Sequence, residues 1–404
     1  MDRHALDVLE LPAIRERLAD ETSFAGGEAL VEALEPSSDP AEVADRQART
    51  AEAIRLHDAG PPRLGGAEDV RSAAAHAARG GVLTPSTLAA VAATVRVAID
   101  TRGVLAQRTA EAPLLADTAA VIEPGLGALA DRIERAIESD GSGVRDGASP
   151  ALRGLRRAIA DARRRATERL RALAASPGLR THLQEDFITE RNGRPVLAVT
   201  ASSRSAVPGI VHDSSGSGQT LFVEPFAVVE LINEASEAMA AERDEVERIL
   251  AELSAGVGTW APALETAVAA LAELDLALAR GLLSRRWGGC PVEPTDGAVE
   301  LLGARHPLLD PATAVPVDLP LAGLRAVVVS GPSPAPGSPR GCARGRRTWR
   351  GSRRWTARRR CRPARRRRPA AAPFAPAGAG RTGGAARRAR ASSGPRSCRR
   401  CSGR

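Results

Sequence analysis

Apolar residues in the first 177 positions recur with helical spacing. Leu6, Leu9, Ile14 and Leu18 follow the three- and four-residue steps of a single helix face. After a break at 36–40, the pattern predicts a helix over 41–56. Thr84-Pro85-Ser86 marks another helix start, because proline fits the first turn, and it leads into a helix over 88–99. Ser149-Pro150 begins a long charged helix that runs to about Ala175.

Residues 185–225 follow a β-type pattern instead. Short runs at 187–189, 195–199 and 220–223 are separated by turn signals at 192–193, 208–209 and 214–218. Asn192-Gly193 between two such runs favours a hairpin. Long helical patterns return over 226–255 and 261–286. The predicted fold class is therefore mainly α with a small β-rich insertion at the tip of antiparallel helical arms.

The pattern changes again after Trp287-Gly288-Gly289. Val299–Leu302 and Val327–Val329 predict strands, and the second ends in Ser330-Gly331-Pro332. A strand that runs into a glycine turn is how a phosphate-binding loop begins.

Composition narrows the function classes. The 404 residues are 43% hydrophobic and 26% charged, the profile of a soluble globular protein of two or three domains. All 57 basic residues are arginine, which excludes any mechanism that needs a lysine. The beginning of the chain lacks a secretory pattern, and no apolar run is long enough to span a membrane, so we expect a cytoplasmic location.

The net charge of +9 is the sum of a basic segment and an acidic segment of the chain. Residues 333–404 contain 23 of the 57 arginines and no Asp or Glu. The remaining 34 arginines face all 48 acidic residues, so residues 1–332 have a net charge of −14. A basic-protein argument for nucleic-acid binding therefore does not apply to the body of the chain.

Several segments together resemble one known family. The run from Val207 to Pro225, VPGIVHDSSGSGQTLFVEP, and the preceding Glu190–Leu197, ERNGRPVL, resemble the signature of the MutS superfamily. They are similar in particular to the second bacterial MutS paralogue, which is linked to recombination suppression and ribosome rescue. Supporting matches are Pro61–Gly66, Gly80–Leu83, Ala304–Leu309, Val317 and Val327–Pro332, so the resemblance covers about 1–332.

The resemblance implies a domain organisation. It implies a helical core and lever at 1–177, a β-rich clamp module at 178–225 and returning lever helices at 226–290. The first strands of an α/β P-loop ATPase domain then occupy 291–332, followed by a disordered Arg/Pro/Gly/Ala-rich tail at 333–404. Because the core pattern begins at residue 6, we expect the front mismatch-reading domain to be lacking, as the resemblance implies for this paralogue. The Phe222-Val223-Glu224 sequence spells the Phe-x-Glu of mismatch readers, but its position within the clamp favours packing.

The same resemblance implies ligands and partners. Family members are homodimers that use ATP and Mg²⁺ and act on duplex DNA or ribosomes. Their clamps contact nucleic acid without reading its sequence, which suits phosphate contacts by arginine and backbone amides. The candidate nucleic-acid residues in the clamp are Arg191, Arg194, Arg204, Ser214, Ser215 and Ser217, and the candidate nucleotide-binding residues are His306, Gly331, Pro332 and Ser333.

Structural interpretations stand beside these functional ones. His212-Asp213-Ser214 contains the residue types of a catalytic triad, but adjacent residues cannot face one another as a triad requires. Ser214–Gly218 fits a flexible hairpin loop as well as a phosphate site, and His306 fits a packed histidine. The Arg163–Arg165 run fits a solvated helix face. The irregular spacing of the cysteines in the tail argues against a zinc site.

The sequence departs from the P-loop pattern after Pro332. A P-loop requires glycines and then Gly-Lys-Ser/Thr, whereas the chain continues Ser-Pro-Ala-Pro-Gly-Ser-Pro-Arg through Arg340, and proline lacks the amide donor. We propose a shift of reading frame as the cause of this departure. Residues 336–340 can be written CCG GGA AGT CCA CGN, which from its third base reads Gly-Lys-Ser-Thr.

Two functions from different classes remain. The first is a DNA-binding ATPase of the MutS superfamily, represented by a fragment that lacks a complete ATP site and any nuclease module. The second is a non-enzymatic nucleic-acid-binding protein whose arginine-rich tail is genuine and contacts RNA or DNA. We also expect residues 295–332 to expose apolar edges.

Overall fold

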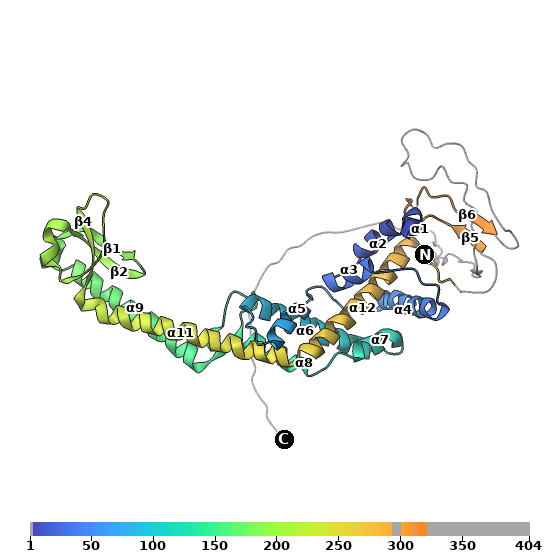
Figure 1. Ribbon diagram of the computed structural model, residues 1–404, viewed down its shortest axis with the longest axis horizontal. Coiled ribbons are helices and arrows are strands. Elements are labelled where there is room, and N and C mark those ends of the chain that lie inside the picture. Colours follow the sequence, from blue (N-terminus) through green and yellow to red (C-terminus); the bar gives the residue numbers. More distant parts are fainter. Residues whose placement is uncertain (1–2, 293–299, 311, 321–404) are drawn as a thin grey trace, which may run out of the picture. The chain divides into compact units, whose positions relative to one another are not determined.

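The computed structural model describes residues 3–292, 300–310 and 312–320 (Figure 1). This part of the chain is mainly helical and contains two small antiparallel sheets, which confirms the predicted fold class. None of the helices in these ranges is both long and apolar enough to cross a bilayer. The predicted strand at 327–329 and the predicted disordered tail lie outside the described residues.

A helical body is assembled around one central helix, α12 (Ala261–Trp287). Buried residues occur on nearly every side of α12, as expected for a helix surrounded by others. It packs against α3, α4, α5 and α7. The other helices of the body are α1 (Arg3–Val8), α2 (Leu11–Ala19), α3 (Ala25–Glu32), α4 (Pro40–Ala59), α5 (Arg71–Ala78), α6 (Pro85–Ala106), α7 (Pro113–Ala120) and α8 (Leu126–Ala136).

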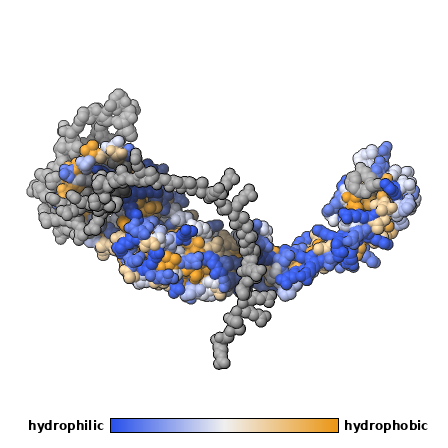
Figure 2. All heavy atoms as spheres, turned by 180° about the vertical axis from the view of Figure 1, so that it is seen from behind, coloured by the Kyte–Doolittle hydropathy of each residue, from blue (hydrophilic) through white to orange (hydrophobic). Residues whose placement is uncertain are grey.

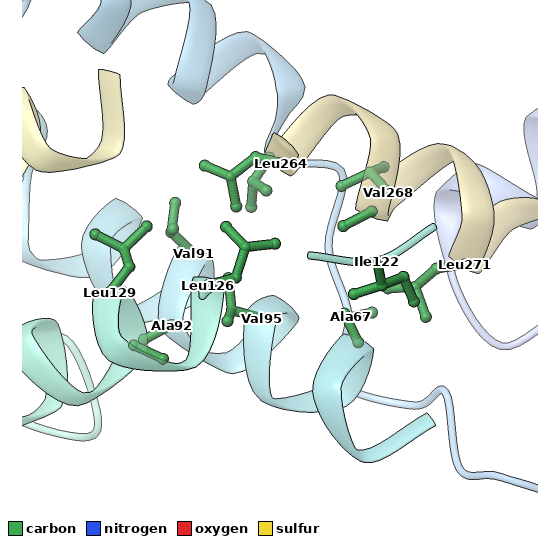
Figure 3. Packing of buried hydrophobic residues seen from close by; sticks show 14 of the residues in the cluster. Ala67, Val91, Ala92, Val95, Ile122, Leu126, Leu129, Leu264, Val268 and Leu271 are labelled. Carbon is green, nitrogen blue, oxygen red and sulfur yellow. The ribbon is translucent and has the colours of Figure 1, made fainter. Parts of the chain in front are cut away.

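The main hydrophobic core lies where α6, α8 and α12 meet (Figure 3). Val91 of α6, Leu126 of α8 and Leu271 of α12 are completely buried there. Burial of each such side chain contributes about 1.5–3 kcal/mol to folding. This core fixes the helices from which the rest of the described chain extends.

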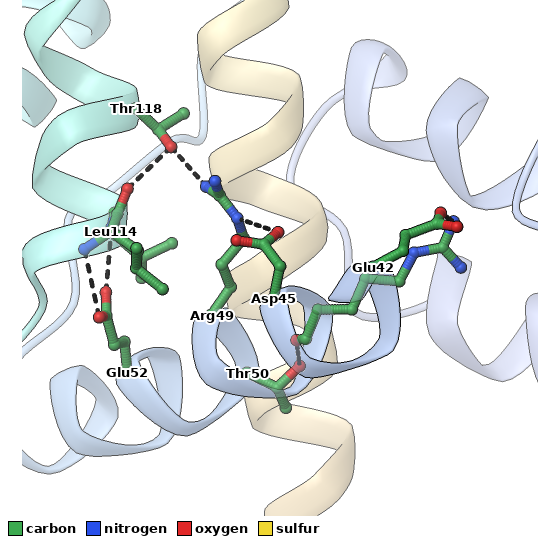
Figure 4. A network of polar contacts seen from close by, with 9 residues as sticks. Glu42, Asp45, Arg49, Thr50, Glu52, Leu114 and Thr118 are labelled. Carbon is green, nitrogen blue, oxygen red and sulfur yellow. Dashed lines mark hydrogen bonds and ion pairs between the residues drawn. The ribbon is translucent and has the colours of Figure 1, made fainter. Parts of the chain in front are cut away.

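Buried carboxylates stabilise two helix starts in the body. Glu52 of α4 accepts hydrogen bonds from the amides of Leu114 (3.2 Å) and Leu115 (3.0 Å) at the start of α7 (Figure 4). Asp275 of α12 accepts from the Ser23 amide at 3.0 and 2.9 Å, just before α3. Neither helix has a capping side chain of its own, so these carboxylates satisfy amides that would otherwise lack partners. Desolvation raises the pKa of Asp275.

Two long helices, α9 (Pro150–Ala174) and α11 (Phe226–Thr259), pack side by side and run antiparallel. Ser149 begins α9: its hydroxyl accepts from the Leu152 amide at 3.0 Å and donates to Glu245 of α11 at 2.6 Å. A hydrogen bond from Arg248, and then the one from Ser149, lower the pKa of Glu245 to about 2. The N-cap residue of α9, Ser149, thus also forms a hydrogen bond to α11.

Residues 178–225, the expected clamp module, contain a four-stranded antiparallel sheet. Its strands are β1 (Leu183–Arg191), β2 (Arg194–Thr200), β3 (Gly209–Ser214) and β4 (Thr220–Pro225), in the order β1-β2-β4-β3, preceded by the short helix α10 (Pro177–Arg180). The predicted hairpin is confirmed: Asn192 and Gly193 have φ angles of 52° and 75°, as a tight β1–β2 turn requires. The sequence pattern placed only turns between 208 and 218, and it missed β3.

One face of this sheet is covered by helices. Leu197, Val199 and Val223 are completely buried and pack with Leu170 of α9 and Val228 of α11. Val223 and Glu224 have no exposed surface, which agrees with the packing interpretation of the Phe-x-Glu sequence. The module and the two long helices therefore share a hydrophobic core.

The second sheet has only two strands, β5 (Glu300–Ala304) and β6 (Val317–Pro320). The strand near 299–302 was predicted, and β6 was not. Leu301, Leu302 and Val317 are large apolar residues of this sheet that remain exposed. These exposed side chains agree with the expectation of exposed apolar surface at 295–332, and the expectation about sheet edges remains a prediction.

Candidate nucleic-acid interface

Arg194 belongs to a buried ion cluster of the clamp sheet. Its guanidinium donates to both carboxylate oxygens of Glu224, at 2.7 and 3.0 Å, and to the side-chain oxygen of Asn233 in α11, at 2.7 Å. The Nε2 atom of His212 lies 2.5 Å from Glu224 Oε2, one of the two oxygens that accept from Arg194. The cluster links β2, β3 and β4 to α11, so Arg194 is committed to an internal contact.

The position of His212 follows from an irregularity in the sheet. The β3–β4 register shifts between Val211 and Asp213, so His212 has no residue opposite it. Such a bulge turns a side chain out of its normal alternation. His212 therefore reaches Glu224, and it does not form a triad with its sequence neighbours Asp213 and Ser214.

Arg191 and Arg204 also have internal partners. The Arg191 guanidinium lies 4.0 Å from the centre of the Phe222 ring and 3.4 Å from the Asp213 carboxylate. Arg204 donates to the carbonyl oxygens of Val207 at 3.2 Å and Gly209 at 2.9 Å, which holds the segment before β3. All three candidate arginines thus stabilise the sheet, and their role in binding nucleic acid remains a prediction.

The serine loop between β3 and β4 forms a closed turn. The Ser215 amide donates to the Thr220 carbonyl at 2.8 Å, and the Ser215 hydroxyl accepts from the Thr220 amide at 3.0 Å. Ser214 and Ser217 are exposed, and Ser215 is half-buried. The loop therefore has a defined conformation in which Ser214 and Ser217 are accessible to a ligand.

A groove of about 780 Å³ lies between the end of α9 and strands β1 and β2. Arg171 and Arg180 contribute positive charge to its lining, and Ile188 and Pro195 contribute apolar surface. The sequence reasoning did not select these two arginines, because their convergence depends on how α9 and α10 meet the sheet. The only signal in the sequence was the helical periodicity of the segment that contains Arg171, which sets the direction of its side chain.

Of the candidate nucleotide-binding residues, His306 alone is described. Its Nε2 atom lies 3.3 Å from the Glu10 carboxylate, and the side chain is half-exposed. Its Nδ1 atom accepts from the Leu308 amide at 3.4 Å. Gly331, Pro332 and Ser333 lie outside the described residues. A P-loop uses a lysine to neutralise the nucleotide phosphates, and this chain contains no lysine.

The described residues include no cluster of three or more His, Cys, Asp or Glu side chains that could hold a metal ion. Among the described residues, the buried carboxylates of Glu52, Glu224 and Asp275 accept the structural hydrogen bonds described above. These groups stabilise helix starts and the clamp sheet.

Comparison with known proteins agrees with the sequence motifs. No family model matches the chain. Endonuclease MutS2 of Pelotomaculum thermopropionicum is 38% identical over 336 residues, which cover 82% of this chain and 42% of that protein. The proteins of the same name from Geobacillus thermodenitrificans and Thermomicrobium roseum are 41% and 40% identical, again over 82% of this chain, and 43% and 44% of their own lengths are matched.

These matches and the clamp motifs define the class: the chain belongs to the MutS superfamily. Within that superfamily, the relatives that it matches are the proteins named endonuclease MutS2. The chain spans less than half the length of these relatives.

Proposed function

We propose that the chain acts as part of a DNA-binding ATPase of the MutS superfamily, one that closes on duplex DNA during repair and suppression of recombination. The observation that carries the proposal is the match to MutS2 proteins over 82% of the chain, which includes the whole clamp module. The accessible serine loop of the sheet supports the same view, because the exposed hydroxyls of Ser214 and Ser217 suit phosphate contacts without sequence reading.

The proposal includes ATP and Mg²⁺ as ligands of the superfamily, but not as tight ligands of this chain. In the superfamily a P-loop lysine neutralises the phosphates, and a carboxylate helps to hold Mg²⁺. The chain has no lysine, and no Asp or Glu follows Asp318. We therefore expect no tight, Mg²⁺-dependent ATP binding by this chain. Isothermal titration with ATP, with and without Mg²⁺, tests this, and micromolar Mg²⁺-dependent binding would contradict it.

Duplex binding tests the central claim. Fluorescence anisotropy with a labelled duplex of about 30 base pairs should show binding that weakens steeply as salt rises, because phosphate contacts release counterions. Two unrelated duplex sequences should bind equally well. The absence of binding at low salt, or a strong preference for one sequence, would refute the proposal. Binding to purified ribosomes is a second experiment, because this branch is also expected to act on stalled ribosomes.

The second candidate function rests on the tail. Its 23 arginines and absence of acidic residues suit a non-enzymatic nucleic-acid-binding arm. If that arm alone binds, deletion of 333–404 should abolish duplex binding. If the shortened chain binds with an unchanged affinity, the tail is not needed and the clamp proposal is favoured.

The reading-frame hypothesis has its own test. Resequencing of the gene across codons 325 to 404 should reveal an insertion or deletion after the codons for Gly331-Pro332 and recover Gly-Lys-Ser-Thr in the other frame. The restored product would then be expected to bind ATP. An unbroken frame would make the arginine tail genuine and would move the non-enzymatic function to first place.

A further inference from the structure

The two long helices carry opposite charge. Helix α9 contains eight arginines and two acidic residues, whereas α11 contains eight acidic residues and two arginines. Some of these charges meet across the contact, where Arg156 pairs with Glu242 and Arg165 pairs with Glu234, both at 2.7 Å. Other charges of the two helices face away from this contact.

The outer face of α9 bears a row of arginines: Arg153, Arg157, Arg164 and Arg171, hereafter the α9 arginine row. The last three are seven residues apart, or about 10.5 Å along the axis, and all four lie within a sector of about 40°. All four are exposed. Ile159 and Ala166, which are buried, occupy roughly the opposite side of the helix.

Little within the described chain neutralises this row. Arg153, Arg157 and Arg171 make no hydrogen bond or ion pair with any described residue. Arg164 bonds only to Asp161 (2.9 Å) and Glu168 (3.6 Å) on its own helix, and both pairs are exposed. Such surface pairs contribute little and are readily exchanged. The structure therefore divides the Arg163–Arg165 run, because Arg163 and Arg165 face α11 and Arg164 faces outward.

The row is continuous with the groove of the clamp module. Arg171, its last member, lines that groove together with Thr167 and Arg180. On the face that Figure 2 shows, the surface of the two long helices is mostly hydrophilic. Positive charge on α9 thus extends from near its start to this groove, whose lining also includes Glu190.

We propose that the α9 arginine row binds the sugar-phosphate backbone of duplex DNA. Guanidinium groups match phosphate oxygens in a two-pronged geometry. The row is about 27 Å long. The 10.5 Å steps between Arg157, Arg164 and Arg171 exceed the screening length of about 8 Å at physiological salt, whereas Arg153 and Arg157 are only about 6 Å apart along the axis. The inference rests on the proposed function and names a surface of contact beyond the clamp module.

The outer face of α11 fixes which side the DNA approaches. Glu230, Glu237 and Asp244 are also seven residues apart, are exposed, and have no hydrogen bond or ion pair with a described residue. This acidic row repels phosphate. The helix pair consequently offers one attractive face and one repulsive face to a nucleic acid.

The test compares two full-length variants by anisotropy over a salt series. In the row variant, Arg153, Arg157, Arg164 and Arg171 are all changed to Gln, which keeps helix propensity. In the control variant, the same change is made at Arg63, Arg79, Arg132 and Arg243, four exposed arginines outside the row. Circular dichroism and thermal unfolding should match the parent for both variants.

For the row variant, the slope of log affinity against log salt should fall by about 3 to 4, since each phosphate contact contributes about 0.9. The control should change the slope by less than about 1. Equal changes in the two variants would overturn the row and leave the proposed function intact. A parent chain that binds no duplex would overturn both.

Arginine modification gives a second, local readout. Because the chain has no lysine, phenylglyoxal should report on arginines without competition from lysine side chains. Bound duplex DNA should protect Arg153, Arg157 and Arg171 while Arg243 remains reactive. Equal protection of Arg243, or protection by duplex RNA but not by duplex DNA, would overturn the assignment.

Discussion

Both sheets are antiparallel, but they differ in how far their apolar residues are buried. In the four-stranded clamp sheet, Leu197, Val199 and Val223 are completely buried. In the two-stranded sheet, Leu302 is 49% exposed and Val317 is 47% exposed. The difference arises because α9 and α11 supply a second layer for the first sheet.

The comparison teaches what makes a small sheet stable. Two strands alone have too little apolar surface to exclude water, and three or more strands packed on helices are needed for independent stability. The clamp sheet adds an internal ion cluster around Glu224, which ties three strands to α11. The β5–β6 pair has hydrogen bonds between its strands but no comparable buried layer among the described residues.

The largest expected effect comes from the shared core of the clamp sheet. Leu197→Ala should lower the free energy of unfolding of the clamp module by about 3 kcal/mol, because it removes a fully buried side chain and leaves a cavity. Hydrogen exchange of peptides from 183–225 measures this locally. Unchanged protection would show that the helices do not stabilise the sheet.

The next effect comes from the ion cluster. Glu224→Gln should destabilise the same peptides by about 2 kcal/mol, because it leaves the Arg194 guanidinium without its charge partner. The partial exposure of Arg194 allows some rehydration, which keeps the loss moderate. Glu230→Gln, an exposed change on α11, is the control. An equal loss for both variants would contradict a specific role of the cluster.

A smaller loss of stability is expected at low pH. The pKa of Glu245 is lowered from 4.5 to about 2, so its contribution to stability is complete above pH 4.5 and is lost as pH falls toward 2. Wild-type α9 and α11 should therefore lose protection against hydrogen exchange more steeply over this window than Glu245→Gln does. Parallel curves for the two proteins would argue against this contact.

The smallest change in stability is expected in the two-stranded sheet. Leu302→Gln should alter the free energy of unfolding by less than about 0.5 kcal/mol, because the side chain is already half in water. It should, however, reduce dye binding and self-association, since it interrupts an exposed apolar surface. A loss as large as that of Leu197→Ala would show that Leu302 is buried in solution.

Much of the fold was predictable because its signals are local. Thr84-Pro85 predicted the start of α6, where the Thr84 hydroxyl accepts from the Thr87 amide at 3.2 Å. The end of α11 was placed too early, at 255, because Gly256 and Gly258 suggest a stop. Gly258 in fact sits within the helix, and an added Cβ there would lie 2.7 Å from the Ala77 carbonyl oxygen. Its role is close packing with α5.

The candidate site was less predictable because its contacts are not local. Nothing in the sequence signals that Arg194 and Glu224, thirty residues apart, form an ion pair, since the pair depends on strand order. The edge strand β3 was missed because Pro208-Gly209 and the serine loop flank it closely. The arginine row escaped notice because eight arginines are spread over α9, and only the position of α11 shows which of them face outward.

The opposite charges of α9 and α11 have a mechanical consequence. With a net charge of +6 on one helix and −6 on its neighbour, the pair has a dipole moment directed across its long axis. The electric field of any large charged body exerts a torque on such a dipole before contact is made. The pair would therefore rotate as it approaches, and a larger share of its collisions would occur in one orientation.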